Sequence, residues 1–596
     1  MMADYLSTSG INSLVNSYYN NEINKKISPL STKKDKYQSI SSAYSTLSTS
    51  LSALQSILSD LKATGSSSIF AGKTTSSSNS AFATITASNS AAISAYNIRV
   101  NQLAKSDMVL GLDLTSDGYS SVITTTGTHS FKIKSGDGES GEFYADVDVT
   151  FDSDDFDETG ITNKTVMEKI RDAVNSDKAV VTSSAKTGTT AYAGGAASFT
   201  VNINGTETTI TIDSATDYND LMDQLVTKIN EEVDGVTAEK IVDSPSAGDV
   251  KLKLSIDDSS DYISISNESG FDLVNDLDIE VTKQKAASGI VVASVFSPLS
   301  STSQLSFTAK NSGYNNRITD LYESGGSNIA LSSIGLNLGT TRSSYVQTEG
   351  GEDTPGFVYA LSDLNSKFNF NGVDIERDSN EVSDLVTGAT ISLKSVMEVT
   401  DATVSVSITN NVSSIKSKIE SFITKFNEIY SYIRTKSTTD DLGNRGIFLG
   451  DTNASSILSM FSNSAYGVVA GINSDEINTL SKLGITFNTS SGLTISDSAK
   501  LEQNLNEKID EVETLFNSTN GIAATLYDKV SSYLGTSGYL TKAKNSVDDS
   551  IEELSDSITS KQEKIEKSAE SLRQRYIEMQ MQLNSLYEIY NSISSM

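Results

Sequence analysis

The chain has 596 residues, with 76 acidic and 45 basic side chains, a single histidine and no cysteine. Its length exceeds one hydrophobic core, so three or four domains are expected, and its acidic excess argues against nucleic acid or an anionic membrane as a partner. The missing cysteines exclude disulfides, thiolate metal sites and thiol nucleophiles, and the lone His129 excludes multi-histidine metal sites and argues against histidine acid–base chemistry.

Two helices are predicted near the start of the chain. The first covers Ser9–Ile27, and Ser28-Pro29 ends it, because proline suits the first turn of a following helix. The second helix runs to about Lys62. Along it, apolar residues step by three and four without a break: Tyr37, Ile40, Tyr44, Leu47, Leu51, Leu54, Leu58 and Leu61.

The middle of the chain alternates like β-strands. The pattern begins within residues 81–109 and includes a weak internal repeat. In one copy, alternating apolar residues flank Asn204-Gly205, a pair typical of a type I′ hairpin turn, and a short helix follows. A similar succession begins at Phe131, and Asn371-Gly372 marks a third, shorter hairpin. These patterns predict small antiparallel modules and not parallel β-α-β units.

Helical spacing returns at residues 412–433, and a hairpin-like insert at residues 483–495 precedes further helices from Lys500 onward. The last of these carries a second stretch stepping by three and four: Leu572, Tyr576, Met579, Leu583, Leu586, Tyr590 and Ile593.

Both heptad stretches predict coiled-coil seams. A step averaging 3.5 residues keeps one apolar row facing a partner helix, which is either the other end of the chain or the same end of another subunit. An internal stripe of a helical bundle is the alternative, and it predicts broader apolar faces. Because both seams are narrow and flanked by polar residues, we predict that their residues form the assembly interface and that the two ends meet in a rod.

Other motifs favour structure over chemistry. Residues 65–74 read GSSSIFAGKT, but the glycine spacing of a phosphate-binding loop is wrong, so a flexible loop is expected. Residues 146–158 hold seven carboxylates and lack the glycine and final glutamate of an EF-hand, which favours a solvated acidic loop over a cation site. His129 is expected at the surface or in a turn. Residues 1–10 show no secretory signal pattern, and no run approaches the about 18 apolar residues of a membrane span.

Several segments resemble one known family. They are GINSLVNSYYNNEINKKISPL at residues 10–30, YNIRVNQLA at 96–104, residues 379–393, LGITF at 483–487 with GLTI at 492–495, Leu515-Phe516, GIA at 521–523 and YIEM at 576–579. In this order and spacing they are similar to flagellar hook-associated protein 2, the filament cap family. The resemblance covers about the first hundred and the last two hundred residues, and residues 106–370 match only through repeats like the inserts of flagellin-like proteins.

The resemblance implies an α+β multidomain fold, with terminal helices forming a coiled-coil leg and a helical bundle around inserted antiparallel β-rich heads. We expect a terminal leg (residues 1–45 and 550–596), a helical and β stem (46–105 and 385–549), a β-rich head (106–125 and 287–384) and a variable outer head (126–286).

The resemblance also implies a cap at the flagellar tip that promotes folding and insertion of exported flagellin. The expected partners are further copies of the chain in a ring, commonly a pentamer, flagellin, the hook–filament junction protein, and an export chaperone at the C-terminal helix. The family leaves the cell through the flagellar export channel without a cleaved signal. No cofactor, nucleic acid or membrane insertion is expected.

Three alternatives stay open from the sequence. A flagellin or junction protein shares the plan of helical ends, although the closing YNSISSM lacks the glutamine- and leucine-rich ending of flagellin. A surface adhesin on a coiled-coil stalk would use the variable head for cell adhesion. An enzyme is the weakest alternative, because no catalytic constellation stands out.

Overall fold

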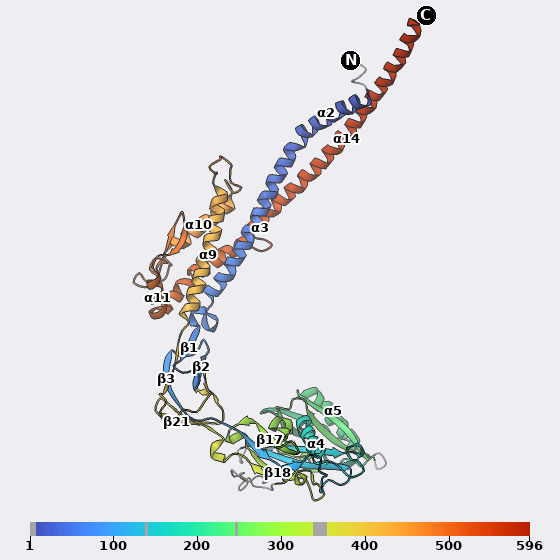
Figure 1. Cartoon of the computed structure of the whole chain (residues 1–596), viewed down its shortest axis with the longest axis vertical. Helices are drawn as coiled ribbons and strands as arrows, with labels where there is room; N and C mark the ends of the chain where they lie inside the picture. Colours follow the sequence, from blue (N-terminus) through green and yellow to red (C-terminus); the bar gives the residue numbers. More distant parts are fainter. Residues whose placement is uncertain (1–6, 137–140, 245–247, 338–354, 596) are drawn as a thin grey trace. The chain divides into compact units, whose positions relative to one another are not determined.

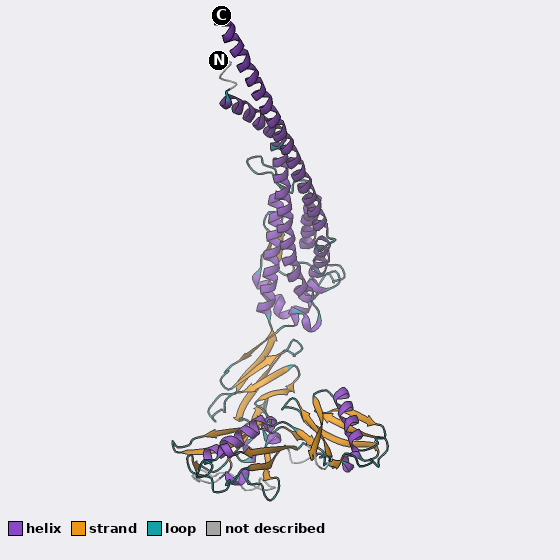
Figure 2. Ribbon diagram, turned by 90° about the vertical axis from the view of Figure 1, so that its right-hand side faces the viewer, coloured by secondary structure: helices purple, strands orange, loops and turns teal. Residues whose placement is uncertain are grey.

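The computed structural model describes residues 7–136, 141–244, 248–337 and 355–595 (Figure 1). The chain divides into two compact units. Unit 1 comprises residues 1–74, 88–90 and 409–596, and unit 2 comprises residues 75–87 and 91–408. Figure 2 shows that unit 1 is mostly helix and that unit 2 is mostly strand. This arrangement confirms the predicted α+β fold with helical ends around β-rich domains.

Unit 1 is built from helices of both chain ends. They are α2 (Thr8–Lys26), α3 (Ser28–Lys62), α9 (Val412–Ser437), α10 (Thr452–Tyr466), α11 (Ser498–Glu507), α12 (Ile509–Asn517), α13 (Ile522–Tyr533) and α14 (Tyr539–Ser594). A single residue, Ile27, separates α2 from α3, and Pro29 stands in the first turn of α3. The two predicted N-terminal helices and their break are therefore confirmed.

The helices of unit 1 share one core. Apolar faces of α3 and α9 meet those of α10 to α13 and the start of α14, and the β25–β26 hairpin (Ile485–Asn488 and Gly492–Ile495) joins them. Phe426 lies near its centre and contacts Phe461, with ring centroids 4.5 Å apart. Asn427 fixes the hairpin, because its side chain accepts from the Leu493 N–H and donates to the Leu493 carbonyl, both at 2.7 Å.

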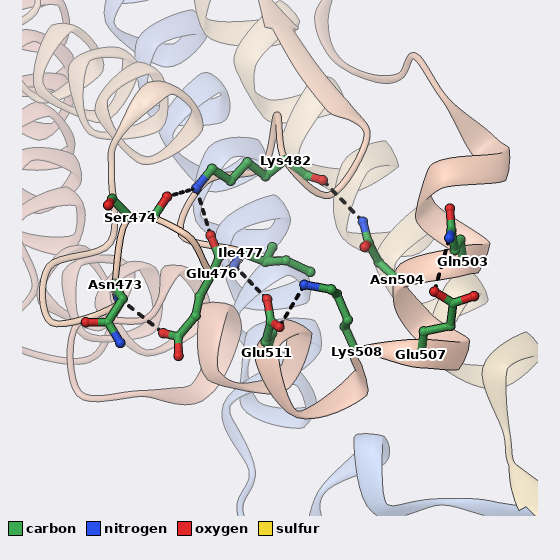
Figure 3. A network of polar contacts seen from close by, with 10 residues as sticks. All are labelled: Asn473, Ser474, Glu476, Ile477, Lys482, Gln503, Asn504, Glu507, Lys508 and Glu511. Carbon is green, nitrogen blue, oxygen red and sulfur yellow. Dashed lines mark hydrogen bonds and ion pairs between the residues drawn. The ribbon is translucent and has the colours of Figure 1, made fainter.

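A polar network anchors the loop before β25 to α11 and α12 (Figure 3). Glu511 accepts a hydrogen bond from the Ile477 N–H at 3.0 Å and an ion pair from Lys508 at 2.9 Å. Lys482 donates to the carbonyl oxygens of Ser474 and Glu476, which closes the loop on itself. The Lys508 ammonium, helped by the Ile477 N–H, lowers the pKa of Glu511 below its usual range, although burial acts in the opposite direction.

Two small sheets, which we name the basal sheets, form one end of unit 2. The larger has the strand order β1 (Lys73–Ser77), β24 (Val404–Asn410), β3 (Ser94–Gln102), β20 (Ser366–Phe370) and β21 (Val373–Arg377). The smaller has the order β2 (Ala83–Ala87), β23 (Ala389–Leu393) and β22 (Glu381–Val386). All of these pairs for which a register is defined are antiparallel, and they enclose a core of their own.

A second core of unit 2 defines what we name the inner module. It combines residues before and after a long insertion: β4 (Ser106–Leu110), β5 (Leu114–Thr115), β6 (Gly127–Ser135), β7 (Phe143–Phe151), α4 (Asn163–Ser176), α7 (Ala287–Ile290), β16 (Val291–Phe296), β17 (Thr302–Ser312), β18 (Ile318–Glu323), α8 (Ala330–Ser333) and β19 (Gly356–Phe357).

The third core belongs to the insertion, residues 179–286, which we name the outer module. Its elements are β8 (Val180–Thr182), β9 (Lys186–Thr187), β10 (Ala197–Ile203), β11 (Thr206–Ile212), α5 (Tyr218–Glu232), β12 (Val236–Ser244), β13 (Asp249–Ile256), β14 (Tyr262–Gly270), α6 (Leu273–Asp276) and β15 (Gln284–Lys285). A seven-stranded sheet, β11-β10-β14-β15-β7-β6-β18, runs through both modules. Its one parallel pair joins β15 to β7.

The two modules repeat one plan, so the weak repeat in the sequence has a structural basis. Each has a hairpin, a helix, a second hairpin and a strand that returns beside the first: β6, β7, α4, β16, β17 and β18 in one, and β10, β11, α5, β12, β13 and β14 in the other. Near the end of α4, the Asn175 side chain makes two hydrogen bonds to the backbone of Ala293, at 2.9 and 3.0 Å. Near the end of α5, Asn230 holds Ala238 in the same way, at 3.0 and 2.8 Å.

The hairpin predictions are confirmed at both Asn-Gly pairs. Asn204 and Gly205 have φ angles of 52° and 87°, and Asn371 and Gly372 have 51° and 89°. These left-handed values at both central positions define a type I′ turn, which favours asparagine followed by glycine.

Three expectations for loops are corrected. Residues 65–71 form two ordered 3₁₀ turns with Phe70 buried, so this segment is not a flexible loop. The first part of the acidic run, Asp146 and Asp148, lies on strand β7 and not in a loop, because alternate residues of that strand are buried. His129 lies within strand β6, half-buried and 5.8 Å from the ring of Phe151, and not in a turn.

The four-part division of the chain stays a prediction. The apolar cores favour a boundary between inner and outer modules near residue 178 over one at residue 126, because β6, β7 and α4 pack with β16 to β18. None of the described helices is long and apolar enough to cross a membrane.

Candidate assembly interface

The two ends of the chain meet where α2 packs on α14 (Figure 1). Ile11 and Val15 of α2 are buried together with Ala569 of α14, and four tyrosine or isoleucine side chains surround them. Arg573 donates to the Asn12 side chain at 2.7 Å and pairs with Glu570 on its own helix. This contact satisfies one of the two pairings considered from the sequence, in which each end is the partner of the other.

The first turns of α14 lie along α3. The Ser41 hydroxyl donates to Asp548 at 2.6 Å, and Lys544 pairs with the second oxygen of the same carboxylate at 2.5 Å. The Lys544 ammonium, helped by Ser41, lowers the pKa of Asp548 below its usual range. Both partners of the carboxylate lie near the surface, so the contact sets the register of the helices and adds little stability.

The first heptad stretch lies mostly inside unit 1. Leu47, Leu51, Leu54, Leu58 and Leu61 are fully buried in the shared core, Tyr44 is 5% exposed, and Tyr37 and Ile40 are half-buried. The Tyr44 hydroxyl donates to Asp451, which also caps α10. Side chains that are fully buried within one chain leave no surface for a second one. From Tyr44 onward, this stretch therefore behaves as the internal stripe of a bundle.

The second heptad stretch becomes exposed toward its end. Leu572, Tyr576 and Leu583 are half-buried, whereas Met579, Leu586, Tyr590 and Ile593 are between 40% and 67% exposed. Its last turns extend beyond the cluster of α2 residues at Ile11 and Val15. An exposed apolar row on a helix favours contact with another helix.

Additional apolar residues that the heptad pattern missed widen this surface. Tyr587 and Ile589 are 60% and 52% exposed. Because successive residues of a helix are rotated by about 100°, Tyr587 lies on one side of the row through Leu586 and Tyr590, and Ile589 lies on the other side. A search for steps of three and four selects a single row and omits its neighbours. We name Met579, Leu583, Leu586, Tyr587, Ile589, Tyr590 and Ile593 the C-terminal apolar face.

The surface has the chemistry of an interface. Among the residues that the structure describes, no group of three or more histidine, cysteine or acidic side chains could hold a metal ion. A groove of about 270 Å³ between α2 and α14 is lined by a few apolar side chains together with Asn16, Glu566, Glu570 and Arg573. Its open, largely polar lining gives no enclosed pocket for a small ligand.

Two family profiles match the chain. Residues 7–107 match the N-terminus of flagellar hook-associated protein 2, and residues 364–588 match its C-terminus. The chain belongs to the flagellar hook-associated protein 2 family. The matched ranges contain α2, α3, the basal strands β1 to β3 and most of α14, whereas the inner and outer modules lie largely between them.

Proteins named flagellar hook-associated protein 2 in other bacteria align with part of this chain. The A-type flagellar hook-associated protein 2 of Pseudomonas aeruginosa is 26% identical over 311 residues, which cover 51% of this chain and 63% of that protein. The flagellar hook-associated protein 2 of Salmonella typhimurium is 30% identical over 245 residues, which cover 39% of this chain and 49% of that protein. The aligned chain thus spans about half to just under two thirds of these relatives' lengths.

Among solved structures, the D1-D2-D3 domains of the flagellar cap protein FliD from Escherichia coli are 17% identical to this chain. The similarity covers 85% of this chain and 99% of that chain, with a TM-score of 0.40. FliD (HAP2) from Pseudomonas aeruginosa PAO1 is 14% identical over 61% of this chain and all of that chain, with a TM-score of 0.25.

Proposed function

We propose that this chain caps the flagellar filament, at whose tip it assembles with further copies of itself and promotes the folding and insertion of flagellin. Membership of the hook-associated protein 2 family supports this role. Both family matches favour it over a flagellin, a hook–filament junction protein or a stalked adhesin. The role is mechanical, so it needs neither a catalytic step nor a cofactor.

The C-terminal apolar face is the observation that carries the proposal. This face continues past the contact between α2 and α14, where the described part of the chain offers no partner for it. An apolar sector of this width on a helix is stable in water only when another helix or a groove covers it. We infer that neighbouring copies in the cap, or the filament end, cover it after assembly.

Replacing Leu583 and Leu586 with Asp tests the proposal. Each Asp would place an unpaired charge in a desolvated contact, at a cost of roughly 2–5 kcal/mol. We expect cells to export flagellin into the medium and to carry hooks without filaments. Electron microscopy of the cells and immunoblots of the medium give the measurement.

A matched control places the same charges on the other side of α14. Asn584 and Ser592 are exposed and lie on the side of α14 opposite the row of Leu583, Leu586 and Tyr590, so Asn584→Asp with Ser592→Asp should leave filaments normal. Filaments of normal length from the Leu583/Leu586 variant would refute an assembly role for this face.

Before assembly, the same face needs protection from aggregation. We propose that an export chaperone covers it by accepting the helix in an apolar groove, and that the protein leaves the cell through the flagellar export apparatus. Deleting residues 572–596 should abolish capture of the chaperone while circular dichroism still shows the β-rich unit 2. Undiminished capture by the truncated chain would place the chaperone site elsewhere.

A further inference from the structure

The outer module is joined to the inner module through a narrow junction. The chain leaves the inner module after α4, at residues 177–179, and returns at residues 284–287. Between these segments, the seven-stranded sheet passes from one module to the other only through β15, whose two residues are Gln284 and Lys285. On the inner side, β15 pairs with β7 at Gln284 and Tyr144, and the Tyr144 N–H donates to the Lys283 carbonyl at 2.9 Å.

One residue ties the outgoing and returning segments together. The Asp177 carboxylate accepts a hydrogen bond from the Ala287 N–H at 2.6 Å, and the Ser288 hydroxyl donates to the Asp177 carbonyl at 3.0 Å. Lys310 extends the contact by donating to the Ser288 carbonyl at 3.2 Å. Asp177 thus connects both linker segments at the point where they are closest to the inner core.

A charged cleft of about 820 Å³ opens beside this junction. Strand β7 contributes Asp146 and Asp148 to it from the inner module, and strand β13 contributes Lys251 and Lys253 from the outer module. The linkers add Asp177, Lys178, Glu280, Gln284 and Lys285. Opposite charges therefore line the two sides of the cleft, while the Asp177 carboxylate shares it with three other acidic groups.

We propose that Asp177 is a proton-sensitive clasp at the base of the outer module: its neutral carboxyl group keeps the outgoing and returning linkers together on the inner module and so limits widening of the cleft, and its charged form loosens the junction. In the closed arrangement, the carboxylate would lie partly desolvated among Asp146, Asp148 and Glu280. Opening lets water hydrate it. The lysines of the cleft and the Ala287 N–H stabilise the charged carboxylate, so they make its protonation less favourable.

The electrostatics of the site agree with this direction. Burial raises the pKa of Asp177 to about 7, against the effect of the Ala287 and Lys178 N–H groups, and the charges of Asp146 and Asp148 raise it further. Burial also lowers the pKa of Lys285, which lies on the returning linker. Because a hydrated aspartate has a pKa near 4, the closed form binds the extra proton between about pH 4 and pH 7. Opening should therefore become up to about tenfold more favourable per pH unit across this window, and it should level off above it.

Hydrogen exchange of the full-length protein measures this opening directly. The amide of Ala287 is the donor to Asp177, so peptides covering residues 284–290 report the clasp after correction for intrinsic exchange rates. We expect the protection of this segment to fall by at least tenfold from pH 5 to pH 7, while residues 221–229 in the core of the outer module keep theirs. Equal protection of the segment at both pH values, or an equal loss in both segments, would overturn the proposal.

Three variants separate the clasp from general stability. Asp177→Asn keeps an acceptor for the Ala287 N–H without the charge. In this variant, the protection of residues 284–290 should stay high and independent of pH. Ser288→Ala removes the second bond and should lower protection at every pH with the slope unchanged. Asp172→Asn, at an exposed position on the same helix, should behave like the parent protein. A pH dependence that persists in Asp177→Asn would also overturn the proposal.

Because the chain has no cysteine, the cleft can be probed with one introduced pair. Thr150→Cys on β7 and Thr237→Cys on β12 place exposed thiols on the two modules. Spin labels there should show a longer mean distance at pH 8 than at pH 5, and the shift should vanish when Asp177→Asn is added. An unchanged distance distribution would show that the junction does not open.

Discussion

At the scale of single residues, Tyr44 shows how an apolar row in the sequence acquires a specific partner. Its spacing with Leu47 and Leu51 predicts a buried side, and the structure confirms that burial. Its hydroxyl finds Asp451, which lies 407 residues further along the chain. No local pattern could identify that acceptor, because the pairing depends on how α3 and α10 pack in the shared core.

This pairing predicts an alkaline limit to the stability of unit 1. Burial and then the hydrogen bond to Asp451 raise the pKa of Tyr44 far above its ordinary value. The unfolded chain loses this proton above about pH 10 while the folded chain keeps it, so stability should fall as pH rises beyond that point. Urea unfolding followed by circular dichroism between pH 8 and pH 11 measures the slope.

Tyr44→Phe is the matched variant for that measurement. At pH 8 the lost hydrogen bond and the unpaired Asp451 oxygen should lower stability by about 1–3 kcal/mol. Above pH 10 the variant should show a smaller slope, because it has one titrating tyrosine fewer. Tyr37→Phe, at a half-buried position where the structure gives the hydroxyl no acceptor among the described residues, serves as the control. Equal slopes in the parent protein and Tyr44→Phe would contradict the assignment.

At the scale of elements, helices and hairpins were predictable wherever their signals were local. Pro29 marks the start of α3, and the pairs Asn204-Gly205 and Asn371-Gly372 fix their turns, because each is favoured by backbone conformation alone. The alternation of Val147, Val149 and Phe151 predicted the strand that carries Asp146 and Asp148, but the same two carboxylates were also interpreted as part of an acidic loop. The charged residues of this strand alternate with buried ones, and a count of carboxylates hides that period of two.

The hydrogen bonds from Asn175 to Ala293 and from Asn230 to Ala238 each lie within one module, so we expect the two modules to lose stability separately when these bonds are removed. Asn230→Ala removes both hydrogen bonds to Ala238 and leaves backbone groups of β12 unpaired, which should cost the outer module about 1–3 kcal/mol. Asn175→Ala should do the same to the inner module through Ala293. Hydrogen exchange resolved by segment should show each loss confined to its own core.

The control for this prediction is Thr227→Ala, because Thr227 is exposed and bonds only to the Asp223 carbonyl of its own helix. It should change neither module by more than a few tenths of a kcal/mol. If Asn230→Ala lowered protection equally in both modules, the two cores would behave as one cooperative unit.

At the scale of the whole molecule, one module is inserted into the other, and this nesting is not visible in sequence patterns. The repeat was visible in the residues, but the insertion of one module into the other was not. It follows from the core that unites β6, β7 and α4 with strands more than a hundred residues later. Likewise, the heptad rows predicted contact between the chain ends, whereas the burial of the first row required the partners α9 to α13.

The nested arrangement predicts that the outer module can be removed cleanly. Ala287 lies within hydrogen-bonding distance of Asp177, so replacing residues 178–286 with two glycines should reconnect the inner module without strain. The shortened chain should keep its helical circular dichroism and a cooperative transition for the inner module. Because the family matches lie largely outside the removed segment, filaments should still form in part.

Replacing residues 126–286 in the same way gives an informative contrast. That deletion also removes β6, β7 and α4, so the inner core should unfold and expose apolar strands. Comparable solubility and stability of the two shortened chains would contradict the boundary near residue 178.

The contact between Asn12 and Arg573 joins residues separated by 561 positions, which makes the order of appearance along the chain important. A chain that emerges from its N-terminus presents α2 and the buried row of α3 long before their partners exist. Closing so large a loop is slow as well as entropically costly. The pairing of α2 with α14 therefore comes after the packing of α3 with α9 to α13 becomes possible, because it needs the part of α14 around Arg573. Until α14 emerges, Ile11 and Val15 of α2 stay uncovered, in the state that proteases and chaperones recognise, whereas the row of α3 can already pack against α9 to α13.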